Sequence, residues 1–554
     1  MKTVLALAAC ASLFALSGAL AAEPSPKTQS PTEAQKPSAT ATSAPDRGVL
    51  FAPEATSSEG SVTVEGQRID YHAVAGSIVV HPKGWDDVAT IEQASAKDEK
   101  DLGDEKNPKA EASMFYVAYF KKGVPSADRP ITFIYNGGPG SSTVWLHMGA
   151  LGPRRVVTAD NSHDPAAPYR LVDNAYSLLD ASDLVFVDAP GTGFSRIAGK
   201  DKEKAFFGVD ADAHAFEQFV LGFLSKYGRW NSPKYLFGES YGTPRSAVLV
   251  NALETGDDVD FNGVILLSQI LNFDLSADGP ELNPGTEEPY IVALPTYAAT
   301  AWYHNLIPGG RPAELEAFLK EVEAFATGDY AHALLEGSQL DPAQRQAIAE
   351  RLAHYTGLSV AYVLKANLRI DGGEFEKTLQ DQAGLTTGRL DTRFSGPSLD
   401  PLSKEADYDP QSAAISSAYV SLFNDYVRKT LGYGEGRIFK PEINVFKYWD
   451  YAHQAPGAST PTPGILNVMP DIANAMKQNP KMKVMVAGGY YDLATPFYEG
   501  WYEMHHLQVP PDLMSNIEFH YYPSGHMVYA HEASLKSLHD DAASFIRKTN
   551  NVGS

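Results

Sequence analysis

Short runs of β-branched, aliphatic and aromatic residues recur along the chain, each about as long as a buried strand. The runs lie at residues 114–119, 131–135, 184–187, 235–237, 264–267, 484–487 and 519–522. Five of them precede, and two follow, a long stretch in which the pattern disappears. We therefore expect an α/β core with a mostly parallel sheet, flanked by helices and interrupted by an insertion.

Between residues 273 and 446 the apolar positions follow a helical period instead. Leu315, Phe318, Leu319, Val322 and Phe325 form one stripe, and a second stripe lies within residues 347–355. This pattern predicts a mainly helical cap inserted into the core. The stripes are more typical of packing surfaces than of ligand contacts.

A Gly-x-Ser-x-Gly motif at residues 238–242 stands directly behind one strand-like run. Ser240 is the only serine of the chain with glycine two residues before and two residues after it. This arrangement is typical of the nucleophile elbow of an α/β-hydrolase, where small flanking residues allow a sharp, strained turn. An ordinary glycine turn is the alternative.

A serine nucleophile needs a base and a carboxylate, which follow it in the order Ser, Asp, His in this fold. Asp492 comes just after the run at 484–487, and His526 comes on the loop after the run at 519–522. The order Ser240, Asp492, His526 is the expected one. Alternatively, Asp492 caps a helix that begins near Thr495, and His526 is a hydrogen-bonded loop histidine.

An oxyanion hole requires two backbone N–H groups, one from the residue after the nucleophile and one from a glycine-rich loop. Tyr241 supplies the first. The loop at residues 136–142 follows the run at 131–135, and either Gly137 or Gly138 supplies the second. A glycine turn without function is the alternative.

Four separated motifs together resemble the serine carboxypeptidases of peptidase family S10, across roughly residues 110–550. They are Asn-Gly-Gly-Pro-Gly-Ser-Ser at 136–142, Asp-Ala-Pro-Gly-Thr-Gly-Phe-Ser at 188–195, Gly-Glu-Ser-Tyr-Gly at 238–242 and Gly-His-Met-Val at 525–528. The resemblance implies that Ser240, Asp492 and His526 form a catalytic triad. It also implies that Gly138 and Tyr241 form the oxyanion hole.

The resemblance further implies that Asn136, Gly137 and Glu239 bind the free carboxylate at the end of a peptide or protein. A neutral Glu239 can donate a hydrogen bond to that carboxylate, whereas an ionised Glu239 repels it. Binding should therefore weaken as pH rises through the pKa of Glu239.

The chain departs from the family at two positions. Ala150 stands where the family has a second glutamate, which suggests activity extending towards neutral pH, and Ser141 stands where the family usually has a disulfide-forming cysteine. Arg154, Arg155 or Arg245 could hold Glu239 ionised or bind a substrate carboxylate. The alternative is that all three are surface or helix-packing arginines.

The N-terminus predicts export. An apolar run behind Lys2 ends in Ala-Leu-Ala-Ala at 19–22, as in a cleaved secretory signal peptide. Cys10, the only cysteine, lies in this run, so the mature chain has no disulfide. Acylation of Cys10 in a lipoprotein is the alternative. A periplasmic or secreted protein is expected.

These observations divide the chain into five parts. They are a signal peptide at 1–22, a disordered Pro/Ser/Thr/Ala-rich linker at 23–47, the first part of an α/β-hydrolase core at 48–272, the helical cap at 273–446 and the second part of the core at 447–554. No later apolar run is long enough to span a membrane.

The net charge of −23 argues against nucleic-acid binding, which needs a basic surface. His505–His506 and His531–Glu532 lack the spacing of known metal sites, so no metal or other cofactor is expected. The glycines at 191–193 are too few for a dinucleotide fingerprint and fit a wall of the hydrolase site better. No feature of the sequence indicates an oligomeric state.

The function expected from these residues is hydrolysis of C-terminal peptide bonds through an acyl-enzyme intermediate, with Ser240 attacking, His526 as base and then acid, and Asp492 orienting the imidazole. An esterase or acyltransferase on the same scaffold is the alternative, because triad and oxyanion hole serve any acyl transfer. A non-catalytic binding protein with the same fold is a more remote one.

Overall fold

The computed structural model describes residues 50–85 and 110–553. The predicted signal peptide and linker, at residues 1–47, lie outside the described residues.

The core is one twisted sheet whose strands follow the spatial order β1-β2-β3-β7-β4-β9-β10-β13-β14, with β8 paired to β3. From β7 to β14 neighbouring strands are parallel, whereas β1, β2, β3 and β8 pair antiparallel. The strands are β1 (Ala55–Val64), β2 (Gln67–Val80), β3 (Glu111–Lys121), β4 (Ile131–Tyr135), β7 (Asp183–Val187), β8 (Arg196–Ala198), β9 (Lys234–Glu239), β10 (Gly263–Leu267), β13 (Lys483–Gly489) and β14 (Ile517–Tyr522).

All seven strand-like runs of the sequence lie within strands of this sheet. The mostly parallel sheet with helices on both faces confirms the predicted α/β-hydrolase fold. β1 and β2 form a long hairpin that the runs did not predict. Two small sheets, β5 (Arg154–Val157) with β6 (Arg170–Asp173) and β11 (Leu385–Thr387) with β12 (Ser395–Pro397), lie apart from it.

Both faces of the sheet are buried, because successive side chains of a strand point to opposite sides. In β9, Tyr235 and Phe237 join one hydrophobic cluster and Leu236 joins the other. In β10, Ile265 and Leu266 divide in the same way. Strands covered on both faces read as continuous apolar runs, which is why the sequence revealed them.

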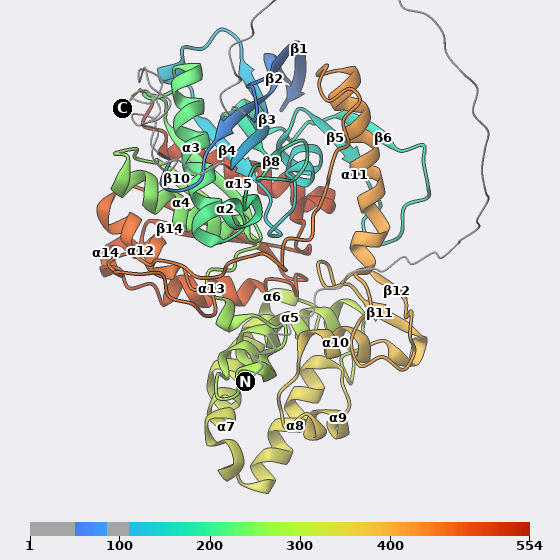
Figure 1. Ribbon diagram of the computed structural model, residues 1–554. Coiled ribbons are helices and arrows are strands. Elements are labelled where there is room, and N and C mark those ends of the chain that lie inside the picture. The colour runs from blue at the N-terminus through green and yellow to red at the C-terminus, as the bar shows by residue number, and fades with distance from the viewer. Residues whose placement is uncertain (1–49, 86–109, 554) are drawn as a thin grey trace, which may run out of the picture.

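Helices cover the two faces unequally. Helices α3, α4 and α12 pack on one face, and α11 and α15 pack on the other (Figure 1). The helices are α2 (Lys202–Phe206), α3 (Val209–Tyr227), α4 (Gly242–Gly256), α5 (Glu288–Tyr303), α6 (Leu315–Phe325), α7 (Ala331–Glu336), α8 (Pro342–Thr356), α9 (Val360–Lys365), α10 (Gly372–Thr378), α11 (Pro410–Lys429), α12 (Met469–Gln478), α13 (Phe497–His505), α14 (Pro511–Met514) and α15 (Glu532–Thr549).

Helices α5 to α10 gather in a lobe below the sheet in the view of Figure 1. The predicted stripe forms α6, which buries Phe318, Leu319, Val322 and Phe325 in the hydrophobic cluster of the lobe. The same cluster contains Tyr491 and nearby residues from the segment after β13. The lobe therefore packs on the segment that carries Asp492.

Helix α11 lies within the range predicted for the cap but contributes Tyr419 and Phe423 to a cluster of the sheet. The limits 273 and 446 of the insertion remain a prediction. Within the described ranges, the helices are too short or too polar to cross a bilayer.

Candidate active site

Ser240 occupies a tight turn between β9 and α4. Its φ is +60°, a left-handed conformation that is uncommon for a residue with a side chain. A Cβ on Gly238 would lie 2.1 Å from the carbonyl oxygen of Gly242, and a Cβ on Gly242 would lie 2.9 Å from that of Tyr135. Glycine is therefore needed on both sides, and the strained turn expected of a nucleophile elbow is present.

The carboxyl ends of parallel strands bring the predicted residues to one edge of the sheet. Ser240, Asp492 and His526 follow β9, β13 and β14, respectively. The end of β10 joins two of them: the Ser240 N–H donates to the Leu267 carbonyl (3.0 Å), and the Ser268 hydroxyl donates to the His526 carbonyl (2.7 Å).

Asp492 and His526 form a buried hydrogen-bonded pair, with 2.8 Å between Asp492 Oδ2 and His526 Nδ1. The Thr495 hydroxyl donates to Asp492 Oδ2 (2.7 Å), and the Thr495 N–H donates to Oδ1 (3.0 Å). The carboxylate is thus fixed by the turn before α13, but it does not cap that helix, whose N-cap residue is Pro496. Because Nδ1 faces Asp492, Nε2 remains for proton transfer.

Burial lowers the pKa of His526, but the charge and hydrogen bond of Asp492 outweigh it, so the pKa lies above its ordinary value. The charge of Glu239 acts in the same direction. No hydrogen bond joins His526 to Ser240 among the described residues. Such bonds are often long without substrate and tighten in the complex.

The glycine-rich loop lies directly against the elbow. A Cβ on Gly137 would stand 2.3 Å from the backbone nitrogen of Tyr241. Gly138 has a φ of +104°, which turns the loop in a way that favours glycine. Among the described residues, the N–H groups of Gly138 and Tyr241 have no hydrogen-bond acceptor. Two free donors beside Ser240 match the requirement for an oxyanion hole.

Glu239 is buried, with only 3% of its surface exposed. Its Oε1 accepts a hydrogen bond from the Tyr529 hydroxyl (3.2 Å), and its Oε2 has no partner among the described residues. Burial raises the pKa of Glu239 to about 7, opposed by the charge of His526, by the hydrogen bond from Tyr529 and by the neighbouring Asn136 side chain. Near neutral pH this carboxyl can therefore carry a proton.

Arg245 holds the start of the glycine loop rather than reaching Glu239. Its guanidinium is fully buried, pairs with Asp212 through two hydrogen bonds (2.6 and 3.2 Å) and donates to the Asn136 carbonyl oxygen (2.7 Å). The Asn136 side chain is fixed in turn, because its Oδ1 accepts from the Leu146 N–H (3.0 Å).

The other two arginines also pair with carboxylates other than Glu239. Arg154 contacts Asp173 at 2.6 Å, and Arg155 contacts Glu532 at 3.1 Å. The packing alternative therefore describes these arginines better than the proposed roles at Glu239.

The Asp-Ala-Pro-Gly motif after β7 is hydrogen-bonded to Thr143, which follows the glycine loop. Asp188 Oδ1 accepts a hydrogen bond from the Thr143 N–H (2.8 Å), and the Thr143 hydroxyl donates to the Val187 carbonyl. A Cβ on Gly193 would collide with Asp188. Gly193 thus allows the loop after β7 to fold back closely on Asp188.

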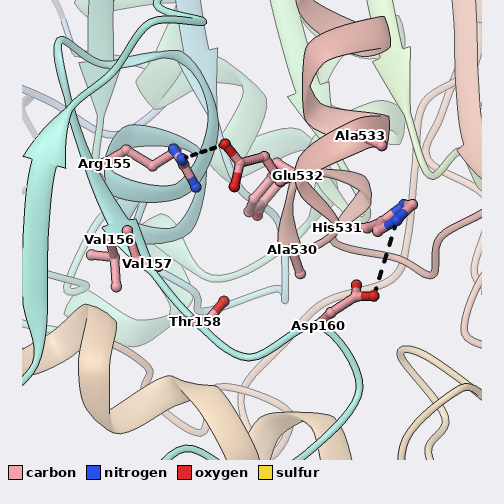
Figure 2. Close-up of a pocket in the computed structure, with 10 residues that line it drawn as sticks. Arg155, Val156, Val157, Thr158, Asp160, Ala530, His531, Glu532 and Ala533 are labelled. Atoms are coloured by element: carbon pink, nitrogen blue, oxygen red, sulfur yellow. Dashed lines mark hydrogen bonds and ion pairs between the residues drawn. The ribbon is translucent and has the colours of Figure 1, made fainter.

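A cavity of about 230 Å³ lies beside Tyr529, between β5 and the start of α15 (Figure 2). Arg155 and Glu532 pair at one side of it, and His531 faces Asp160 (4.0 Å) at the other. Val156, Ala530 and Ala533 are among the apolar residues of its wall. The cavity thus combines apolar wall with charged rim.

Residues 50–85 and 110–553 contain no group of three or more His, Cys, Asp or Glu side chains that could hold a metal ion. The rings of His505 and His506 bond backbone carbonyls of their own helix, Trp501 and Tyr502 at 2.7 Å.

Three residues of the site were not predicted from the sequence: Thr495, Ser268 and Tyr529. Their positions offered only weak signals. Thr495 is three residues beyond Asp492, and Tyr529 is three residues beyond His526. Nothing local shows that Tyr529 turns back towards Glu239.

Part of the chain matches a known protein family. The family model "Serine carboxypeptidase" matches residues 102–341, a range that holds three of the four motifs. Residues 102–341 are therefore similar to the serine carboxypeptidases. The match confirms the resemblance drawn from the motifs. Asp492 and His526 lie beyond the matched range, so their assignment rests on position and geometry.

Curated relatives in the carboxypeptidase family match over limited segments. "Serine carboxypeptidase-like 50" of Arabidopsis thaliana is 28% identical over 214 residues, covering 38% of this chain and 43% of the relative. "Carboxypeptidase Y homolog" of Arthroderma benhamiae is 32% identical over 135 residues, covering 24% of each. The chain thus spans less than half the length of the curated relatives it matches.

Solved structures with other names align with much of the chain, at low TM-scores and low identity. Proline iminopeptidase of Mycobacterium smegmatis aligns with 90% of this chain and 100% of its own, at a TM-score of 0.33 and 13% identity. The epoxide hydrolase of Aspergillus niger aligns with 79% of this chain and 76% of its own, at a TM-score of 0.30 and 14% identity.

Proposed function

We propose that this protein is a serine carboxypeptidase, which removes the C-terminal residue of peptides through an acyl-enzyme intermediate. One observation carries the choice over other acyl transfers: Glu239, directly before Ser240, is buried and has an unpartnered carboxyl oxygen. An esterase has no need of a proton-bearing carboxyl next to its nucleophile. A peptidase that requires a free C-terminus does, because a neutral carboxyl can donate to the terminal carboxylate.

In this proposal Asn136, Gly137 and Glu239 bind the terminal carboxylate. Glu239 donates the proton on Oε2, and the N–H of Gly137 and the side-chain amide of Asn136 add further donors. The hydrogen bonds from Arg245 and Leu146 hold Asn136 in place for this task. Binding of the carboxylate places the last peptide bond over the elbow.

The acylation step uses the residues that lie at the carboxyl edge of the sheet. Ser240 Oγ attacks the carbonyl carbon while His526 Nε2 accepts the hydroxyl proton, and Asp492 stabilises the imidazolium through Nδ1. The N–H groups of Gly138 and Tyr241 stabilise the oxyanion, and the loss of one such donor typically costs about 100-fold to 1000-fold in rate. His526 then returns the proton to the leaving amine as the C–N bond breaks.

Deacylation repeats these roles with water. Water loses a proton to His526 and attacks the acyl carbon, and the ester bond to Ser240 Oγ breaks as Oγ regains a proton from His526. The cavity beside Tyr529 is the candidate space for the side chain of the released residue, because its wall contacts Glu239 through Tyr529.

The test compares one peptide as free acid and as C-terminal amide, incubated with the full chain and analysed by mass spectrometry. Ser240→Ala is the blank, and Ser537→Ala, on the exposed face of α15, is the control for replacing a serine away from the site. We expect sequential loss of residues from the free acid, much slower loss from the amide and no loss with Ser240→Ala. Equal processing of both peptides would show that no free carboxylate is required. Cleavage of neither, with turnover of simple esters, would favour the esterase alternative.

A further inference from the structure

The two carboxyl oxygens of Glu239 have different surroundings. The Tyr529 hydroxyl donates to Oε1, whereas Oε2 is buried without a partner among the described residues. A protonated carboxylic acid has a single O–H. Since Oε1 already accepts a hydrogen bond, the proton is favoured on Oε2.

The ring of Tyr529 is fixed by packing. A Cβ on Gly149 would lie 2.7 Å from the Tyr529 ring and 2.8 Å from that of Tyr419, so both rings press on backbone that has no side chain. The next residue, Ala150, is buried and offers no polar side-chain atom to Glu239. Tyr529 thus fills the space beside Glu239 on the side of Gly149 and Ala150.

The ionisable surroundings of Glu239 are few. His526 and Asp492 face it from the loops after β14 and β13, Tyr529 faces it from the turn at Val528–Ala530, and Tyr419 faces it from α11. Burial raises the pKa of the Tyr529 hydroxyl well above its ordinary value. Tyr529 therefore remains a neutral donor at every pH at which the protein would work.

We propose that Tyr529 is a positioning residue for the carboxyl of Glu239: its hydroxyl holds Oε1, so that the proton on Oε2 is presented to the terminal carboxylate of the peptide. The inference rests on the proposed function and adds a residue to it. The Tyr529 phenol donates to Oε1, so it favours the ionised form of Glu239, whereas a second carboxylate would disfavour it. Tyr529 thereby sets the upper pH limit of carboxylate binding.

The kinetic test uses Tyr529→Phe, which removes the hydroxyl and keeps the ring on Gly149. Tyr419→Phe is the matched control, since that ring packs on the same glycine and makes no hydrogen bond to Glu239. For the free-acid peptide at pH 6, Tyr529→Phe should raise KM about tenfold, the effect of one hydrogen bond to a carboxyl group, with kcat within about twofold. The pH at which KM begins to rise should move upwards, and Tyr419→Phe should leave both unchanged.

A second measurement needs no turnover. The carboxylic C=O stretch of Glu239 is identified by infrared difference spectroscopy as the band that Glu239→Gln lacks, and its pH midpoint is measured. Tyr529→Phe should shift the midpoint upwards, whereas Tyr419→Phe should not. An unshifted midpoint in folded Tyr529→Phe, or equal KM changes for free acid and amide, would overturn the proposal. Failure of the unchanged chain to cleave the free acid would instead overturn the proposed function, whatever the infrared result.

Discussion

Arg245 on α4 donates a hydrogen bond to the backbone carbonyl oxygen of Asn136, the first residue of the glycine loop, over 2.7 Å. Through this contact the helix behind the elbow also fixes the loop in front of it. Asp212 on α3 compensates the charge of the guanidinium, and both side chains are buried. Elbow and loop are therefore positioned by one ion pair.

Replacement of Arg245 by Met should destabilise the protein by about 3–5 kcal/mol, because it leaves Asp212 buried without a counter-charge. Denaturant unfolding of the full chain measures this loss. Arg245→Lys should recover only part of it, since an ammonium group cannot form the same two parallel hydrogen bonds. The double variant Arg245→Met with Asp212→Leu should be more stable than Arg245→Met alone. Equal stability of both variants would contradict the importance of the unpaired charge.

The pH dependence of kcat/KM for a free-acid peptide should be bell-shaped. His526 must be neutral to accept a proton, and its pKa is raised, so activity should fall on the acid side. Glu239 must be protonated to bind the carboxylate, and its pKa is about 7, so activity should fall as pH rises through that value. The maximum then lies near neutrality, where the two coupled groups share protons.

A C-terminal amide separates the two limbs of this profile. It carries no terminal charge for an ionised Glu239 to repel, so its slower hydrolysis should retain the acid limb and lose most of the alkaline one. Initial rates of hydrolysis of both peptides, measured in the same series of pH buffers, test this difference in the alkaline limb. Identical alkaline limbs would assign that limb to a group other than Glu239.

Thr495 is expected to orient Asp492, the acid of the proposed triad. Thr495→Val keeps the shape of the side chain and removes the hydroxyl that donates to Asp492 Oδ2 at 2.7 Å. We expect kcat to fall about tenfold, the effect of one hydrogen bond to a charged group, with KM nearly unchanged. Steady-state kinetics of the free-acid peptide test this. An unchanged kcat would show that the remaining bonds suffice to orient Asp492.

His453 predicts a pH-dependent contribution to stability away from the site. Burial lowers its pKa, but hydrogen bonds to Asp210 (2.6 Å) and Asp471 (2.9 Å) outweigh burial and raise the pKa to about 9. A raised folded-state pKa stabilises the fold fully below about pH 6.5, and the contribution is lost as pH rises through about 9. His453→Gln should therefore cost about 3 kcal/mol at pH 6.

Unfolding free energies of the unchanged chain and of His453→Gln should converge above about pH 9. His505→Gln is the control, because His505 is exposed and bonds only a carbonyl of its own helix. It measures the effect of replacing a histidine by glutamine at an exposed position. A difference for His453→Gln that is constant from pH 6 to pH 10 would contradict the raised pKa.

Much of the core was predictable because its strands are buried on both faces. The continuous apolar runs at β9, β10 and β13 need no knowledge of their neighbours to be recognised. The strained turn at Ser240 was equally local, since it depends on glycines two residues away on each side. The hairpin of β1 and β2 was missed because β1 is mostly exposed or half-buried and both strands carry many small and polar side chains.

Residues that act through distant partners could not be predicted in this way. Tyr529 and Glu239 are 290 positions apart, and Arg245 and Asn136 are 109 apart. For Arg245 the sequence left three roles open: holding Glu239 ionised, binding a substrate carboxylate, or packing. Only the position of Asp212 on α3 decided between them.

The sequence by itself determined the order of the strands along the chain, the place of the elbow and the residue types available to the site. These follow from local periodicity and from the steric demands of short turns. The tertiary structure decided which side chains meet: Asp492 with His526, Arg245 with Asp212, and Tyr529 with Glu239. Such pairs depend on the parallel register of strands that are far apart in the chain, and no local pattern encodes that register.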